Sequence, residues 1–172
     1  MENIKNNYLK LKTLMNEAKE NYKIFQLLNS DKKITKIFEH NLKINSEIIK
    51  NACLYKSIML LCRVFVDLNK HAYTINKLLK DIKKNCSQIN DSNIKETVSF
   101  VESKLQEKEK TMSRLRKRRN KQYAHNDKDF FINERKIKEE LPLYFSDKEG
   151  LIMLWEIIEK KLDFIFNIKS SI

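Results

Sequence analysis

The chain has 172 residues, a length that fits one domain with a single hydrophobic core. One glycine and one proline cannot supply a glycine-rich phosphate loop or frequent tight turns, which excludes nucleotide kinases and Rossmann enzymes and predicts long helices. The formal net charge of +12 favours a polyanionic partner, although lysines scattered over solvated helix faces would give the same total.

Cysteine and histidine positions give no sign of a metal site or a disulfide framework. Cys53, Cys62 and Cys86 are odd in number and lack paired spacing, which fits a reducing cytoplasm. His40 lies in a polar stretch and His71 at an expected helix end, and neither has partners spaced for a metal. Without a signal-like apolar run or ~18 consecutive apolar residues, we expect a cytoplasmic protein that does not enter a membrane.

The first expected helix runs from about Asn3 to Leu28 and carries an apolar stripe at steps of three and four residues. A basic amphipathic helix could lie on a membrane, but the matching seams of later helices favour packing in a core. The stripe consists of Tyr8, Leu11, Met15, Ala18, Tyr22 and Phe25.

A turn with a helix cap is expected at Asn29–Asp31, followed by one long helix from Lys32 to about Asn69. Ile58–Cys62 is apolar all round, which predicts the most buried part of this helix. Arg63 could pair with Asp67 one turn away or could support a functional site. The expected core positions are Ile34, Phe38, Ile48, Ala52, Tyr55, Met59, Cys62 and Val66.

Two further helices are expected in the middle of the chain. One runs from Thr74 to about Lys84, and the other begins near Ser92, after a loop-like segment, and reaches roughly Tyr123. Their core positions are Ile75, Leu78, Leu79 and Ile82 in the former, and Ile94, Val98, Val101, Leu105, Met112 and Leu115 in the latter.

The last third of the chain predicts a short helix from Asn133 to about Glu140, ended by Pro142, and then a long one. Ser146 and Glu149 have the spacing of a capping box. The wide apolar face of the final helix either closes the bundle or contributes to a dimer. It carries Leu151, Leu154, Trp155, Ile158, Leu162, Ile165 and Phe166. The chain is therefore predicted to be a single all-α domain over residues 1–172, an antiparallel bundle of four to six helices.

Ser113–Asp127 is the stretch that indicates a function. The chain otherwise relies on lysine for positive charge, and a local change to arginine favours planar, bidentate contact with phosphate or carboxylate. The arginines are Arg114, Arg116, Arg118 and Arg119.

Helical phase places part of this stretch toward protein. At roughly 100° per residue, Lys117, Lys121 and Ala124 fall on the side away from Leu115. The half that Leu115 occupies also receives Arg118, Arg119, Tyr123, His125 and Asn126. A half-buried charge persists only when something pairs with it, and a phosphate would serve. Asn126 and Asp127 can end or kink the helix, however, so the side on which His125 lies depends on where the helix stops.

Arg119-Asn120, followed by His125, resembles the arginine-to-histidine signature of the HEPN superfamily. Together with Ala124 and Asn126-Asp127, the stretch resembles in particular the abortive-infection U-type HEPN proteins of bacteria. The resemblance implies an all-helical, metal-independent endoribonuclease whose site forms where two protomers meet, with no cofactor.

The chemistry expected of such a site needs proton transfer and charge stabilisation. His125 would be the general base or acid, Arg119 would stabilise the phosphorane, and Asn120 would orient His125 or a phosphate. One histidine is short of an acid and a base, which makes a homodimer part of the expected site. The expected RNA-binding residues are Arg114, Arg116, Arg118, Lys121 and Tyr123.

The resemblance also implies a biological role. It suggests a toxin of an abortive-infection or toxin-antitoxin system that cuts tRNA, mRNA or ribosomal RNA, restrained by a cognate antitoxin or a nucleotidyltransferase. A rival interpretation is a non-catalytic module that binds RNA or a nucleotidyltransferase partner. Asp127 weighs against modification by such a partner, because modified relatives usually carry a tyrosine there. A helical scaffold with a solvated basic end is the remaining interpretation.

Overall fold

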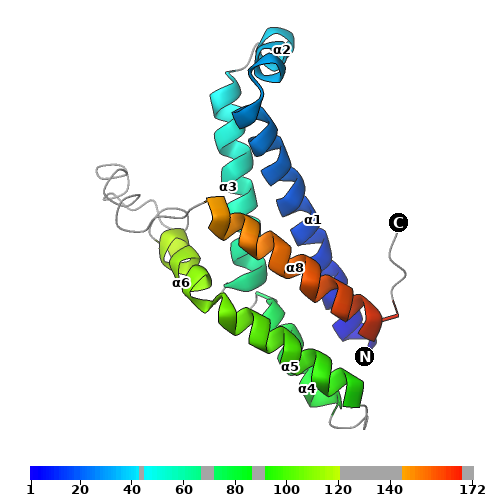
Figure 1. Cartoon of the computed structure of the whole chain (residues 1–172). Helices are drawn as coiled ribbons and strands as arrows, with labels where there is room; N and C mark the ends of the chain where they lie inside the picture. The colour runs from blue at the N-terminus through cyan, green and yellow to red at the C-terminus, as the bar shows by residue number, and fades with distance from the viewer. Residues whose placement is uncertain (43–44, 67–71, 87–91, 121–144, 168–172) are drawn as a thin grey trace.

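A computed structural model describes residues 1–42, 45–66, 72–86, 92–120 and 145–167. Within these ranges the chain forms helices and no strand, which confirms the predicted all-α class (Figure 1). The helices are α1 (Glu2–Ser30), α2 (Lys32–Leu42), α3 (Ser46–Phe65), α4 (Ile75–Cys86), α5 (Ser92–Glu107), α6 (Glu109–Arg118) and α8 (Phe145–Ile165).

Helices α1 and α3 form the long axis of the fold. They pack side by side and run in opposite directions, with α2 at their far end (Figure 1). The predicted cap between α1 and α2 is confirmed, because Asp31 Oδ1 accepts hydrogen bonds from the backbone N–H groups of Lys33 and Ile34 at 2.8 and 3.1 Å. The expected first-helix stripe is buried along its whole length, as predicted.

The expected single helix from Lys32 to Asn69 is wrong, because the structure divides it into α2 and α3. Asn45 caps α3 by accepting from the backbone N–H of Glu47 at 2.8 Å, and the Ser46 hydroxyl donates to Glu39 Oε1 of α2 at 2.5 Å. Hydrogen bonds from the hydroxyl and the backbone N–H of Ser46 lower the pKa of Glu39. The break between α2 and α3 changes the helical phase, and with it the residues that face the core.

The new phase exposes three residues that were expected in the core, Ile48, Ala52 and Tyr55. Ile48 is 65% exposed and Tyr55 is 44% exposed. The second half of α3 fits the prediction better, since Ile58, Leu61 and Cys62 are buried. Arg63 is exposed, whereas Asp67 lies outside the described residues.

The expected helix from Ser92 to Tyr123 is also divided, at Lys108. There the backbone N–H of Lys108 donates to the carbonyl oxygen of Leu105 at 3.0 Å, three residues back, which makes a tighter turn than the α-helix. Helix α6 begins at the next residue. The predicted core positions on both sides of the break are nevertheless buried, apart from the partly buried Ile94. All four predicted core positions of α4 are buried as well.

Helix α8 packs against α1 and α5 and closes the core, and its predicted apolar residues are buried or partly buried. It begins at Phe145, before the predicted cap. Glu149 accepts hydrogen bonds from Tyr22 and Gln26 of α1, at 3.3 and 3.0 Å, in place of the expected capping-box contact with Ser146. The expected helix at Asn133–Glu140 lies outside the described residues.

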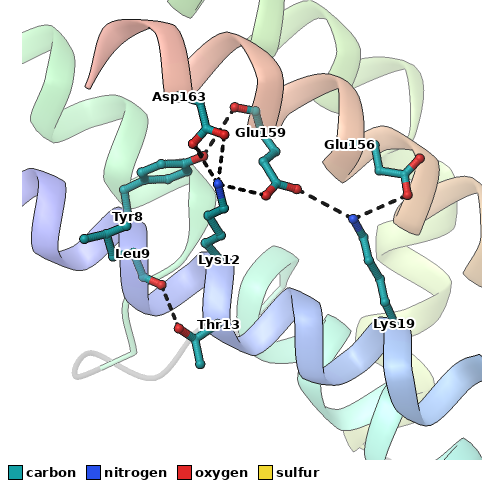
Figure 2. Close-up of polar contacts among 8 residues, drawn as sticks. All are labelled: Tyr8, Leu9, Lys12, Thr13, Lys19, Glu156, Glu159 and Asp163. Carbon is teal, nitrogen blue, oxygen red and sulfur yellow. Dashed lines mark hydrogen bonds and ion pairs between the residues drawn. The ribbon is translucent and has the colours of Figure 1, made fainter. Parts of the chain in front are cut away.

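A polar network joins α1 to the end of α8 (Figure 2). The Tyr8 hydroxyl donates to Asp163 Oδ1 at 2.6 Å, and Lys12 Nζ lies 2.8 Å from Asp163 Oδ2 and 3.1 Å from Glu159 Oε1. Burial, the hydrogen bond to Asp163 and the nearby carboxylates raise the pKa of Tyr8 well above its ordinary value. Burial opposes the charge of Lys12, but its hydrogen bonds to Asp163 and Glu159 outweigh that effect and raise its pKa. The network fixes the rotation of α8, so that Asp163 faces inward.

Within the parts of the chain that the structure describes, no helix has the length and hydropathy that a bilayer crossing requires.

Candidate nucleic-acid interface at the end of α6

Helix α6 carries the arginine-rich stretch and is held by its apolar side. Met112 and Leu115 are buried in the core, and the helix packs against α3 and α5. Because the helix turns by about 100° per residue, burial of Leu115 fixes which way the following basic residues face. Lys117 is exposed, whereas Arg119 is half-buried, in agreement with the predicted phase.

Arg114 ties α6 to the first turn of α8. Its Nη2 atom donates to Asp147 Oδ1 at 2.5 Å, and the Thr111 hydroxyl donates to the same oxygen at 3.2 Å. Asp147 is buried and lies at the N-terminal end of its helix, where the helix dipole favours a negative charge. A charge-assisted contact of this kind fixes the position of α6 beside the start of α8.

Arg119 and Asn120 contact each other directly after α6. The Nε and Nη2 atoms of Arg119 donate to Asn120 Oδ1 at 3.1 and 2.9 Å. Both donors of the guanidinium fork therefore converge on one amide oxygen, which sets the plane of the arginine. A phosphate oxygen at the position of that amide oxygen would receive the same two hydrogen bonds.

Arg116 lies between these two contacts and is half-buried. Its Nε atom is buried and has no hydrogen-bond partner among the described residues. A buried donor without a partner costs free energy, so an acceptor supplied by a ligand would stabilise this side chain.

Of the predicted site residues, the structure brings Arg119 and Asn120 together and turns Arg114 toward protein. The Arg118 side chain, Lys121 and Tyr123 lie outside the described part of the chain, and so does His125. The distance between the predicted catalytic arginine and histidine therefore stays a prediction.

Sequence reasoning missed Asp147 and Thr111. No local pattern indicates the contact, because Asp147 lies 33 positions after Arg114 in the chain. Among the described residues, no group of three or more His, Cys, Asp or Glu side chains is placed to hold a metal ion.

The all-helical fold and the contact of Arg119 with Asn120 directly after α6 agree with the class of helical proteins that the sequence resembles. A family model described as AbiU2 (HEPN_AbiU2) matches residues 1–160, so the chain belongs to this HEPN family. The matched region includes Arg119, Asn120 and His125. No curated protein and no solved structure gives a significant match.

Proposed function

We propose that this protein is a metal-independent endoribonuclease and that Arg119, Asn120 and His125 carry its activity. The observation that supports the proposal is the Arg119–Asn120 contact at the end of an anchored helix, within a chain of the AbiU2 family. Arginine keeps its charge at all physiological pH values, and its fork fits two oxygens of one phosphate.

The proposed reaction uses the nucleophile that RNA already carries. His125 takes the proton of the ribose 2′-OH, and the hydroxyl oxygen forms a bond to the adjacent phosphorus. Arg119 stabilises the charge of the crowded phosphorane, and the bond to the 5′-oxygen then breaks as that oxygen receives a proton. The products are a 2′,3′-cyclic phosphate and a 5′-hydroxyl end, and the balance needs no oxidant, metal or water.

A homodimer belongs to the proposal because one histidine cannot serve at the same moment as base and acid. A two-fold contact would bring two copies of Arg119 and His125 to one scissile linkage. Specific activity should therefore fall when the protein is diluted below the dissociation constant of the dimer.

The test compares RNA cleavage by the parent protein with cleavage by variants of the proposed site. His125→Ala should lower the rate about 10²- to 10⁴-fold, and Arg119→Ala about 10²- to 10³-fold. Lys117→Ala is the matched control, because it removes an exposed cation two positions from Arg119. Cleavage that disappears with EDTA, or that His125→Ala leaves unchanged, contradicts the proposal.

The wider role is a toxin that halts growth in the cytoplasm by cutting tRNA, mRNA or ribosomal RNA. Expression of the parent protein in bacteria should arrest growth and produce RNA fragments, and expression of His125→Ala should do neither. If His125→Ala and Arg119→Ala still bind RNA, and RNA cleavage in their presence equals that with the parent protein, the chain is a binding module instead.

A further inference from the structure

Helices α5 and α8 frame a second surface, at the opposite end of α8 from Asp147. An open hollow of about 490 Å³ lies between the two helices and is lined by Asn93, Glu96, Thr97, Lys160, Lys161 and Phe164. We call it the α5–α8 groove. An adjoining hollow of about 230 Å³ continues past Phe164 to Ile165 and Asn167.

One aromatic ring, Phe164, lines this groove, and a second, Phe100, lies beside it against Lys161. Phe164 is 72% exposed and Phe100 is 37% exposed. Single exposed apolar residues are common, but an exposed ring in a hollow lined by cations is a recognised arrangement for a ligand with flat bases and phosphates. The inward network at Asp163, the preceding residue, keeps Phe164 turned outward.

Two lysines lie over the Phe100 ring. Lys161 Nζ lies 5.4 Å and Lys104 Nζ 5.9 Å from the centre of the Phe100 ring. At about 100° per residue, Lys160, Lys161 and Phe164 share one face of α8. All three line the groove together with residues of α5, the helix beside which α8 runs (Figure 1). Lysine side chains and aromatic rings therefore lie close together on this surface.

We propose that the α5–α8 groove binds a single-stranded segment of RNA. One base stacks on Phe164, and Lys160 and Lys161 contact the phosphates on either side of that base. Thr97, which also lines the groove, offers a hydroxyl group to a base edge. The choice of RNA as the polyanion rests on the proposed nuclease function, but binding at the groove is separate from cleavage.

The distance along α8 between the groove and Asp147 sets the length of RNA that could reach both sites. Phe164 follows Asp147 by 17 positions on the same helix, which is roughly 26 Å at the α-helical rise. The groove is thus remote from the end of α6, and one RNA must be long to reach both. Loss of Phe164 should weaken the binding of long substrates and leave the cleavage of very short ones unchanged.

A second copy of this chain is the competing occupant, and charge disfavours it. In a two-fold contact the same patch meets itself, which would bring Lys160 and Lys161 of one copy near those of the other. Like charges in close contact weaken an interface, whereas a phosphate backbone is attracted to them.

The test measures binding of a labelled, unstructured oligouridine to full-length His125→Ala by fluorescence anisotropy at several salt concentrations. Phe164→Ala should weaken binding about 5- to 100-fold. Lys160→Ala should reduce the slope of log affinity against log salt by about 0.7. Glu96→Gln, which removes the carboxylate that lines the groove, should strengthen binding.

Two variants serve as controls. Met153→Ala removes another exposed apolar side chain of α8 outside the groove, and Lys23→Ala removes an exposed cation of α1. Both should bind like the parent, and all variants should melt like the parent because the altered side chains face solvent.

Parent-like binding by Phe164→Ala and Lys160→Ala overturns the inference. So does a change from dimer to monomer in Phe164→Ala, which would assign the groove to contact between copies. Failure of the proposed nuclease function gives a different result from failure of the groove proposal. In that case His125→Ala leaves RNA cleavage unchanged, whereas Phe164→Ala and Lys160→Ala still bind RNA more weakly than the parent.

Discussion

The contact of Arg114 with Asp147 gives a prediction that joins stability to the site. Asp147→Asn keeps the shape of the side chain and removes the charge that receives hydrogen bonds from Arg114 and Thr111. A hydrogen bond to a charged group contributes about 1.5–3 kcal/mol. The Arg114 side chain is 29% exposed, and solvent screening places the loss at the lower end, about 1.5–2 kcal/mol.

Thermal unfolding followed by circular dichroism measures this loss. For a chain of this size, about 1 kcal/mol corresponds to a shift of roughly 2–4 °C, so Asp147→Asn should lower Tm by about 3–8 °C. Arg114→Ala should give a similar shift. The double variant should be little worse than the more damaging single variant, because both changes remove the same contact.

The same pair of variants decides whether Arg114 also contacts RNA. If its role is only to hold α6, Arg114→Ala and Asp147→Asn should weaken RNA binding equally. If Arg114→Ala weakens RNA binding more than Asp147→Asn does, while the two variants lower Tm equally, Arg114 also contacts a phosphate. A Tm within ~1 °C of the parent for Asp147→Asn, or additive losses in the double variant, would refute the proposed coupling.

Three further predictions concern the fold. Asp163→Asn should cost about 2–3 kcal/mol in urea unfolding, because a buried acceptor of Tyr8 loses its charge, and an unchanged midpoint would contradict this. Gly150→Ala should stabilise the chain by ~0.5–1 kcal/mol in the same assay, because Gly150 lies within α8 and a Cβ would meet only the flexible end of Lys108 at 3.4 Å; a loss of stability would contradict it. Burial and the adjacent Glu149 raise the pKa of Tyr22 to about 12, whereas an unfolded tyrosine ionises near about 10. Its stabilising contribution is full below pH ~10 and is lost as the pH rises toward ~12, so Tm measured against pH should fall over that interval.

The sequence predicts helices best where apolar spacing is regular and uninterrupted. The stripe of α1 from Tyr8 to Phe25 and the apolar face of α8 are buried as expected, because burial of a continuous stripe dominates the choice of helix phase. The two helix breaks escaped prediction because neither uses glycine or proline. Asn45 begins a new helical phase by capping the N-terminus of α3, and the break at Lys108 uses a tighter turn.

The candidate site likewise has features that the sequence predicted and one that it did not. Helical phase predicted that Arg119 lies on the inner side of α6, since one buried residue, Leu115, sets the phase for the next turn. It could not predict that Arg114 bonds to Asp147, because a contact between distant parts of the chain depends on how helices pack. The Arg119–Asn120 pair, by contrast, is local and follows from adjacency.

The arginines of α6 therefore cannot act as one uniform track for a phosphate backbone. Arg114 is neutralised by a carboxylate inside the fold, so phosphate binding there would have to compete with a short, partly buried ion pair. The Nε and Nη2 atoms of Arg119 donate to the uncharged amide oxygen of Asn120, and exchange of this neutral acceptor for an anion strengthens both bonds. A phosphate should therefore select Arg119 over Arg114. Arg119→Ala should accordingly reduce the salt dependence of RNA binding more than Arg114→Ala does, and equal slopes for the two variants would show that their different surroundings do not govern binding.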